Sequence, residues 1–311
     1  TIYSFLNHKI KKKFSFFDNL SENNFVNNKS SEKQNNIIIS KSGNTLETIV
    51  NLNLILKKKK VNSNTFITEF KNNILLKVAN ELKAEVIEHK NFIGGRYSVM
   101  SEAGMIPAYL MGLKTEKFKQ LNSLIFNKRF LNSLISDVFF IYKLLLKKKN
   151  NSIILNFDKD MHNLCLWYQQ LISESLGKKG KGFLPIISTL PRDHHSLLQY
   201  HLDGPKNSFF TIFSSNHLKS NNLSNSFLLG QTNYLLNKLL EEIMEAQKIA
   251  TENTFLRKKI PFRTFHVLKK NEEELGVLFT FFVLETIFLS RILKVNPFDQ
   301  PAVEQIKKET K

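Results

Sequence analysis

The sequence predicts an α/β fold made of two tandem α/β/α sandwich domains, with mainly parallel sheets and a helix at the C-terminus. Short apolar runs alternate with segments of helical periodicity, which is typical of parallel strands covered by helices. The alternation occurs twice along the chain, with a helical region between the two sets. A length of 311 residues fits two domains, and 42% hydrophobic with 23% charged residues is typical of a globular protein.

The first domain, residues 1–125, is expected to contain three strands and two helices in alternation. Each strand is a short apolar run that ends in a polar turn. We expect an N-terminal portion to be missing, because the chain starts at Thr1 without methionine and few residues precede the first strand. In chain order the expected elements are a strand over 36–40, a helix to about 56, a strand over 65–69, a helix over 73–82 and a strand over 85–88.

The second domain, residues 126–311, repeats this alternation after a helical region over 118–146. Its most apolar stretch, Leu275 to Leu293, contains Glu285 and Arg291, so a core helix is expected here and not a membrane span. The expected strands cover 152–156, 184–188 and 209–213, and the expected helices cover 160–176, 233–248 and 272–293.

The composition restricts the classes of partner. A net charge of +18 would favour a nucleic-acid partner. However, the lysines lie mostly in short polar runs without an aromatic platform, so no nucleic-acid partner is expected. The single cysteine, Cys165, excludes a disulfide within the chain and is expected to be buried. With no visible secretory signal and no membrane span, the chain is expected to be cytoplasmic.

The segment IIISKSGNTLETI is the strongest local signal for a binding site. A buried strand is expected to end before Ser40, and Ser42 and Thr45 add further hydroxyl groups. Gly43 allows a tight turn, Lys41 adds a positive charge, and a helix follows whose first N–H groups favour an anion. The segment matches neither the Walker nor the dinucleotide pattern. It is therefore interpreted as a phosphate-binding loop, with a plain capped turn as the alternative.

Two further segments carry groups suited to sugar chemistry. Arg96 follows Gly94 and Gly95, so a guanidinium is expected at a tight turn where it could hold an oxyanion. Gln170 and Glu174 are spaced i and i+4 near the end of a predicted helix, and Glu174 is a candidate general base. A structural salt bridge for Arg96 and a solvated surface position for Glu174 are the alternatives.

The C-terminal part adds a histidine and a lysine. His194 and His195 are expected to open a helix, and no cysteine or acidic set at metal-binding spacing surrounds them, so no metal is expected. A histidine near its ordinary pKa suits proton transfer. Further on, Asp299 and Gln300 are expected to precede a helix that carries Lys307.

Five segments, taken in order, resemble the phosphoglucose isomerase family. They are SKSGNTLET, IGGRYSVMS, ISESLGK, HHSLLQ and the pattern S-x-I-L-x(4)-F-D-Q-x-A-V-E-x(2)-K from Ser290 to Lys307. The resemblance extends over nearly the whole chain. It departs at Glu102, where the family usually has a small residue, and at the front, where the family has a further stretch that ends in a Gly/Ser-rich phosphate-binding turn.

This resemblance implies reversible interconversion of glucose 6-phosphate and fructose 6-phosphate through a cis-enediol, in glycolysis and gluconeogenesis, without metal or cofactor. It implies that His195, helped by Lys307, opens the sugar ring. Glu174 would then move a proton between C2 and C1, and Arg96 would stabilise the enediolate. The residues implied to hold the phosphate and the sugar hydroxyls are Ser40, Lys41, Ser42, Thr45, Gln170 and Gln300.

Members of the family are dimers in which the histidine reaches the partner's active site. The resemblance therefore implies a homodimer with His195 shared across the interface. Three alternatives stay open at this point: a non-catalytic sugar-phosphate binding module of the same fold, an isomerase of both glucose and mannose 6-phosphates, and a basic nucleic-acid binder supported only by the net charge.

Overall fold

The computed structural model describes residues 1–20, 34–57, 61–216, 222–224, 226, 230–303 and 309. Its internal contacts divide the chain into two compact units. The N-terminal unit is His8–Glu116, and the C-terminal unit is Lys117–Lys311 together with Thr1–Asn7. The contacts thus divide the chain at Lys117, whereas the sequence places the boundary after residue 125, and the first seven residues belong with the C-terminal unit.

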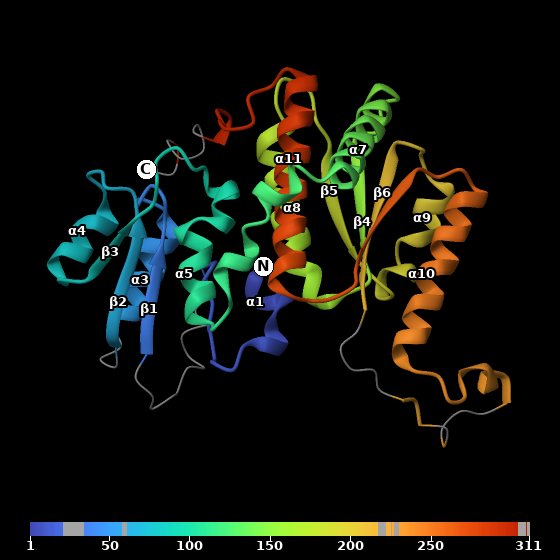
Figure 1. The fold of residues 1–311 in the computed structure, drawn as a ribbon, viewed down its shortest axis with the longest axis horizontal. Helices are drawn as coiled ribbons and strands as arrows, with labels where there is room; N and C mark the ends of the chain where they lie inside the picture. The colour runs from blue at the N-terminus through green and yellow to red at the C-terminus, as the bar shows by residue number, and fades with distance from the viewer. Residues whose placement is uncertain are drawn as a thin grey trace. The chain divides into compact units, whose positions relative to one another are not determined.

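The N-terminal unit is built on a three-stranded parallel sheet of order β1-β2-β3. The two strand-to-strand connections of this sheet each contain a helix, as short parallel units require (Figure 1). The elements are β1 (Gln34–Ile39), α3 (Leu46–Leu56), β2 (Val61–Thr68), α4 (Ile74–Glu81) and β3 (Glu85–Glu88).

Both helices pack on the same face of this sheet. Ile38 of β1 and Phe66 of β2 are partners in the parallel register, and both are buried. They form one apolar cluster with Leu52 of α3 and with Leu75 and Ala79 of α4. The core of this unit therefore rests on the apolar runs that the sequence shows.

The remainder of the N-terminal unit follows β3. The short 3₁₀ helix η2 (Gly95–Met100) leads into α5 (Glu102–Leu110), and Ser101 caps α5 by accepting a hydrogen bond from the Ala103 N–H. Glu102 lies in the first turn of α5, where a carboxylate interacts favourably with the helix dipole.

The C-terminal unit contains a four-stranded parallel sheet of order β5-β4-β6-β7. The strands are β4 (Asn151–Asn156), β5 (Leu184–Thr189), β6 (Ser208–Ser215) and β7 (Phe262–Val267). The sequence analysis did not predict β7, because Arg263 and His266 interrupt its apolar pattern.

Helices cover both faces of this sheet, with α7, α8 and α11 on one side and α9 and α10 on the other (Figure 1). The α helices of the unit are α1 (Ile2–Phe5), α6 (Leu121–Leu124), α7 (Lys128–Leu146), α8 (His162–Leu176), α9 (Leu198–Asp203), α10 (Leu240–Arg257) and α11 (Glu272–Leu293). The described 3₁₀ helices outside η2 are η1 (Asn7–Lys9), η3 (Thr115–Phe118), η4 (Lys159–Met161), η5 (Arg192–His194) and η7 (Gly230–Leu235).

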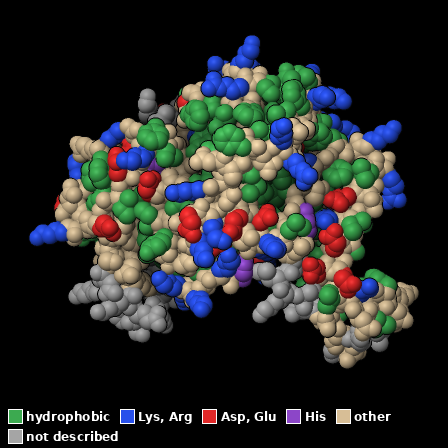
Figure 2. All heavy atoms as spheres, viewed as in Figure 1, with side chains coloured by type: hydrophobic (Ala, Val, Ile, Leu, Met, Phe, Trp, Pro, Cys, Tyr) green, Lys and Arg blue, Asp and Glu red, His purple; other side chains and the backbone are tan. Residues whose placement is uncertain are grey.

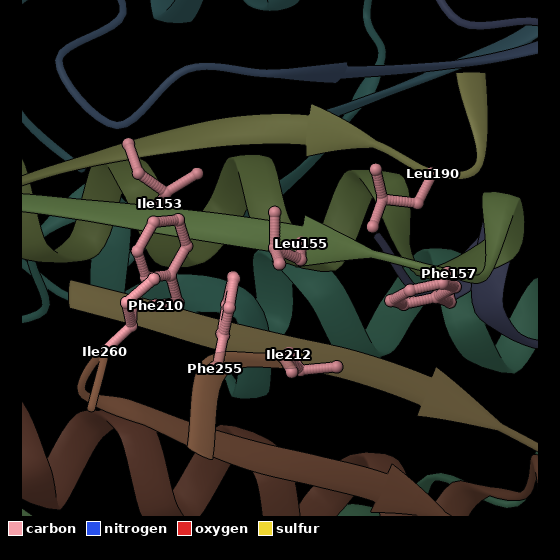
Figure 3. Close-up of a cluster of buried hydrophobic side chains, with 8 residues drawn as sticks. All are labelled: Ile153, Leu155, Phe157, Leu190, Phe210, Ile212, Phe255 and Ile260. Atoms are coloured by element: carbon pink, nitrogen blue, oxygen red, sulfur yellow. The ribbon is translucent and has the colours of Figure 1, made fainter. Parts of the chain in front are cut away.

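One face of β4 and β6 forms the core beneath α9 and α10. Alternate residues of each strand point to this side, as the two-residue period of a strand requires (Figure 3). Phe255 of α10 lies against Phe210 of β6 with ring centroids 4.6 Å apart. The buried cluster consists of Ile153, Leu155, Phe157, Leu190, Phe210, Ile212, Phe255 and Ile260.

Helix α11 is the one described helix long and apolar enough to cross a membrane by length and composition, and 61% of its most apolar window is buried. It packs against α7 and α8, so we interpret it as a core helix. Glu285 is fully buried and pairs with Arg263 of β7. Burial raises the pKa of Glu285 to about 8, with the neighbouring Asp137 carboxylate adding to the shift against the opposing charge of Arg263.

The structure confirms the predicted α/β class with two parallel sheets. Cys165 is buried in α8, and burial raises the pKa of its thiol, so the thiol stays protonated as expected of an inert core cysteine. The helix predicted after Gln300 falls largely on residues outside the described part of the chain.

Candidate active site

The predicted phosphate-binding loop begins where β1 ends. The Ser40 N–H donates to the Ile67 carbonyl at 3.1 Å, which continues the pairing with β2 for one residue. The Gly43 N–H then donates to the Ser40 carbonyl at 3.1 Å and closes a turn. Gly43 has φ +63°, in the left-handed region that favours glycine. The glycine is therefore required by the backbone of the turn.

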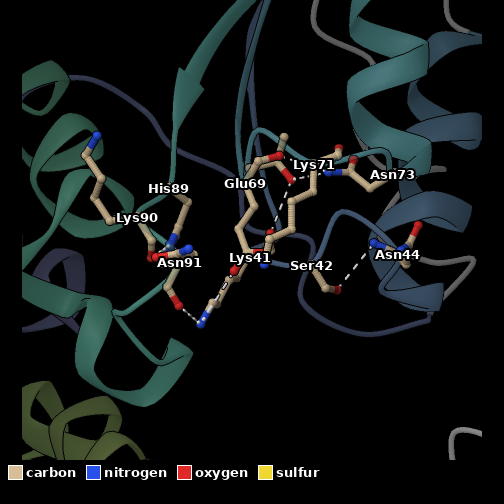
Figure 4. Close-up of polar contacts among 10 residues, drawn as sticks. Lys41, Ser42, Asn44, Glu69, Lys71, Asn73, His89, Lys90 and Asn91 are labelled. Atoms are coloured by element: carbon tan, nitrogen blue, oxygen red, sulfur yellow. Dashed lines mark hydrogen bonds and ion pairs between the residues drawn. The ribbon is translucent and has the colours of Figure 1, made fainter.

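The start of α4 holds the loop from the other side (Figure 4). The Leu75 N–H donates to the Gly43 carbonyl at 3.1 Å, and the Ile74 N–H donates to Oδ1 of Asn44 at 3.1 Å. A Cβ at position 43 would lie 2.0 Å from Oδ1 of Asn73. Asn73 is thus packed directly against the glycine, and the sequence analysis did not identify this contact.

The loop hydroxyls are ordered within the unit. Ser40 Oγ and Thr45 Oγ1 are 2.8 Å apart, and Ser42 Oγ accepts from the Asn44 N–H at 3.3 Å. Ser40 is buried, whereas Ser42 and Thr45 are exposed. Thr45 precedes α3 without capping it through its side chain, because its hydroxyl is turned to Ser40. A phosphate at this helix start would meet hydroxyl groups and N–H groups together.

Lys41 connects the loop to the segment that follows β3. Its Nζ donates to the Asn91 carbonyl at 2.8 Å and lies 3.6 Å from Oε1 of Glu69 (Figure 4). Glu69 also pairs with Lys71 at 3.0 Å, so one carboxylate interacts with two ammonium groups. Lys41 is therefore partly neutralised while it remains beside the loop.

Arg96 lies a few residues beyond Asn91, in η2 after the glycine pair. Its side chain is 3% exposed, and its guanidinium carbon lies 5.3 Å from the centroid of the Tyr97 ring. The guanidinium is thus packed within the unit, and its contact with a substrate stays a prediction. The structure places Arg96 and the loop in the same unit.

The candidate base lies in the C-terminal unit, near the end of α8. Gln170 Nε2 donates to Oε1 of Glu174 at 2.9 Å, as the i, i+4 spacing predicts. The helix ends at Leu176, followed by Gly177. Glu174 is half-buried and Gln170 is exposed, so the pair lies at the rim of a rigid helix.

Lys178 makes contacts in this region that were not predicted from the sequence. Its side chain is largely buried and its Nζ pairs with Oδ1 of Asp299 at 2.7 Å. The same Nζ donates to the backbone carbonyls of Asn296 and Asp299. These contacts fix the segment that carries Gln300 beside the end of α8. A lysine after a helix-ending glycine is the only sequence signal for this role, and it is a weak one.

The two adjacent histidines point in different directions. His194 Nε2 lies 3.2 Å from Thr251 Oγ1 of α10, and its ring packs on Phe157. Burial, followed by the neighbouring His195 charge, lowers the pKa of His194. His195 is exposed, and its ring has no hydrogen-bond partner within the described residues. Of the two histidines, His195 is therefore the one whose ring is open to solvent, and its contact with a substrate stays a prediction.

Asp193 fixes this arrangement. Its carboxylate accepts from the Thr189 N–H at 2.7 Å and from Ser188 Oγ at 3.2 Å, so it ties η5 to the end of β5. The Arg192 guanidinium, bonded to the same carboxylate at 2.8 Å, is the main cause that holds the pKa of Asp193 below its usual value. The sequence analysis did not identify Asp193.

Glu174 and His195 lie near opposite ends of strand β5. Helix α8 runs back to the amino-terminal end of β5, so Glu174 lies near that end. His195 follows the carboxyl-terminal end of the same six-residue strand. At about 3.3 Å per residue, the strand separates the two side chains by roughly 20 Å. The structure therefore does not bring these two predicted residues together within one chain.

Lys307 lies outside the described residues.

Within the part of the chain that the structure describes, no three His, Cys, Asp or Glu side chains form a group that could hold a metal ion.

The chain resembles known proteins in sequence. Residues 8–182 match the phosphoglucose isomerase family. The chain is 30% identical over 295 residues to a probable glucose-6-phosphate isomerase of Methanococcus maripaludis, over 89% of this chain and 65% of that protein. It is 32% identical over 287 residues to the glucose-6-phosphate isomerase of Mycoplasmopsis pulmonis, over 87% of this chain and 67% of that protein. The chain thus spans about two thirds of the length of these curated relatives.

The fold is shared with solved structures. A hypothetical protein of Thermus thermophilus superposes with a TM-score of 0.78 at 21% identity, over 88% of this chain and 70% of that one. A glucose-6-phosphate isomerase of Chlamydia trachomatis superposes with a TM-score of 0.69 at 17% identity, over 88% of this chain and 58% of that one. At these identities the likeness supports the fold and nothing finer.

Proposed function

The chain belongs to the phosphoglucose isomerase family, and from this premise we propose that it interconverts glucose 6-phosphate and fructose 6-phosphate. The observation that carries the proposal is the position of Glu174, a half-buried carboxylate on a rigid helix with one oxygen held by Gln170 at 2.9 Å. A carboxylate positioned in this way can act as the base in proton transfer beside a carbonyl. The names of the sequence relatives support the choice of substrate.

In this proposal the loop after β1 binds the phosphate. The exposed hydroxyls of Ser42 and Thr45 and the Lys41 ammonium receive the dianion, and buried Ser40 holds Thr45 in place at 2.8 Å. Binding at a group remote from the reacting carbons orients the sugar and lowers the entropic part of the barrier.

The chemistry then proceeds at C1 and C2. His195, with Lys307, opens the ring by moving a proton between the C1 hydroxyl and the ring oxygen. Glu174 takes the proton from C2 and returns it to C1, while Arg96 stabilises the enediolate that forms between the two steps. Gln170 and Gln300 orient the sugar hydroxyls, and Lys178 positions the segment that carries Gln300.

The separation of Glu174 and His195 supports a dimeric enzyme. Because a six-residue strand lies between them, one chain cannot place both side chains on one sugar ring. In the proposed homodimer each site takes its glutamate from one protomer and its histidine from the other, as the two-fold symmetry of such an assembly allows.

The first test measures conversion of fructose 6-phosphate through a glucose-6-phosphate dehydrogenase couple. The wild-type chain is expected to turn over, and Glu174→Gln to lose at least about 10²-fold in kcat while fructose 6-phosphate still binds within a few-fold. Glu81→Gln, an exposed carboxylate of α4, is the matched control and should behave as wild type. Unchanged kcat in Glu174→Gln would refute the assignment of the base.

The second test mixes two inactive variants. Glu174→Gln and His195→Ala, refolded together in equal amounts, form mixed dimers in which one of the two sites is free of both substitutions. About one quarter of wild-type activity should return by random pairing. No recovery, with mixed dimers demonstrated by mass, would contradict the shared histidine.

Binding without turnover by the wild-type chain would instead favour a sugar-phosphate binding module. The nucleic-acid alternative gains no support from the face of the molecule that Figure 2 shows. Figure 2 shows basic side chains scattered over the visible face with acidic ones among them, not a continuous basic stripe of the kind that follows a phosphate backbone.

A further inference from the structure

A pocket lies where the strands of the four-stranded sheet begin, at their amino-terminal ends. None of the residues proposed above for the active site line it. Its volume is about 130 Å³. Its walls come from the segments that lead into three parallel strands. These are Lys149 before β4, Pro205, Lys206 and Ser208 at the start of β6, and residues 258–261 before β7. The end of α9 adds Tyr200 and His201. We refer to it as the edge pocket.

Four lysines surround the edge pocket, and no carboxylate is among the described residues that line it. They are Lys149, Lys206, Lys258 and Lys259, and none of them forms an ion pair with a described acidic residue. Lys149 Nζ donates to the Lys206 carbonyl at 2.5 Å, and Lys206 Nζ donates to the Leu202 carbonyl at 2.7 Å. These two ammonium groups are therefore held at the rim by neutral carbonyl groups.

The lysines repel one another. Burial, followed by the charges of Lys147 and Lys206, lowers the pKa of Lys149. Lys258 and Lys259 also line the pocket, and both are exposed. An anion bound here would relieve the repulsion and would meet several cationic donors at once.

His201 lines the edge pocket and carries a ring nitrogen that makes no hydrogen bond with the described residues. Nε2 of His201 is buried and has no hydrogen-bond partner among the described residues. The ring of His201 is fixed in place, because it packs edge-on against Phe210 with centroids 5.2 Å apart. Tyr200 lies beside it and is 54% exposed. The pocket thus combines a fixed imidazole, ammonium groups at the rim and an exposed aromatic ring.

We propose that the edge pocket binds a diphosphate group, as an anion site separate from the loop after β1. A volume of about 130 Å³ is below the range of about 300–1,000 Å³ typical of pockets for drug-sized ligands, so the part of a ligand that the pocket encloses is a compact anionic group. Two linked phosphates offer more negative charge and more acceptor oxygens to the four lysines than a single carboxylate does. The diphosphate is either free or the exposed end of a nucleotide whose base lies on Tyr200.

Titration calorimetry with pyrophosphate at about 0.15 M ionic strength tests the proposal. Lys258→Gln/Lys259→Gln is expected to weaken binding by about tenfold or more, because two charged contacts are removed. Lys119→Gln/Lys269→Gln removes the same charge from exposed positions of the same unit and should leave the affinity within about twofold, since screening limits the effect of distant charges. The substituted lysines are all exposed, and thermal melts confirm that each variant folds.

The loop after β1 also attracts phosphate, so a third variant separates the two sites. Ser42→Ala/Thr45→Ala should keep the pyrophosphate affinity of the edge pocket. The proposal is overturned if the wild-type chain does not bind pyrophosphate, if the Lys258/Lys259 pair and its control behave alike, or if binding disappears only in the loop variant.

ADP distinguishes the two sources of the diphosphate. Tighter binding of ADP than of pyrophosphate, lost in Tyr200→Ala, assigns the pocket to a nucleotide. Binding of pyrophosphate but not of ADP assigns it to the free anion. Either result supports recognition of the diphosphate itself.

Discussion

Gly43→Ala tests the geometry of the phosphate-binding loop directly. The added Cβ would lie 2.0 Å from Asn73 Oδ1, which is far inside van der Waals contact, so the Asn73 side chain must move. That oxygen caps α4 by accepting from the Leu76 N–H at 2.8 Å, and the side-chain nitrogen donates to the Glu69 and Lys71 carbonyls at 3.0 Å. The substitution therefore disturbs the loop and the start of α4 together.

The magnitude follows from two terms. A non-glycine residue at φ +63° costs about 1–2 kcal/mol. Loss of the Asn73 cap costs about 1 kcal/mol more, with a further contribution from the buried donors left unpaired. We expect the free energy of unfolding of the N-terminal unit to fall by about 2–4 kcal/mol, measured by urea denaturation.

Gly112→Ala is the matched control. Gly112 also has a positive φ, +84°, in the same unit, but a Cβ there meets no atom within 4 Å. It should lose only the strain of about 1–2 kcal/mol. In an Asn73→Ala background the obstructing side chain is absent, so the cost of Gly43→Ala should fall to that of Gly112→Ala. If Gly43→Ala costs no more than the control, or if Asn73→Ala leaves its cost unchanged, Asn73 does not hold the loop.

Two further predictions concern the C-terminal unit. The folded pKa of Glu285 is about 8 and lies above its ordinary value of 4.5, so the stability contributed by its protonated form is fully present below about pH 4.5 and is lost as the pH rises through 8. Glu285→Gln should lose less stability than wild type between pH 5 and 8 in urea denaturation, with a difference of up to about 1.4 kcal/mol per pH unit; parallel curves would contradict the shifted pKa. Lys178→Met should raise the KM for fructose 6-phosphate several-fold, because the segment before Gln300 loses its anchor at Asp299. Lys179→Met, at the exposed neighbouring lysine, should leave KM unchanged, and equal effects of the two would argue against a positioning role.

Much of the fold could be predicted because its signals are local. The apolar runs that become β1 to β6 and the periodic segments that become α3, α8 and α11 are readable from a few neighbouring residues. Strand β7 was missed because its Arg263 interrupts the apolar pattern. That arginine is buried, and its guanidinium contacts Asp137, Glu285 and Tyr168, three residues distant in sequence. A local pattern cannot show that a charge is compensated in this way.

The candidate site also has a part that can be predicted from the sequence and a part that cannot. The groups of the loop are readable from the sequence alone, since Ser40 to Thr45 supply their hydroxyls, glycine and helix start within six residues. The Gln170 and Glu174 pair is readable in the same way, because helical periodicity places residues four apart on one face.

Which of the two adjacent histidines is exposed depends on packing between distant parts of the chain. The ring of His194 contacts Thr251 of α10, whereas His195 is exposed to solvent. The same packing brings Asp299 onto Lys178 and places His195 near the opposite end of β5 from Glu174. These arrangements depend on contacts between residues far apart along the chain, which form when strands and helices pack and which no short stretch of sequence encodes.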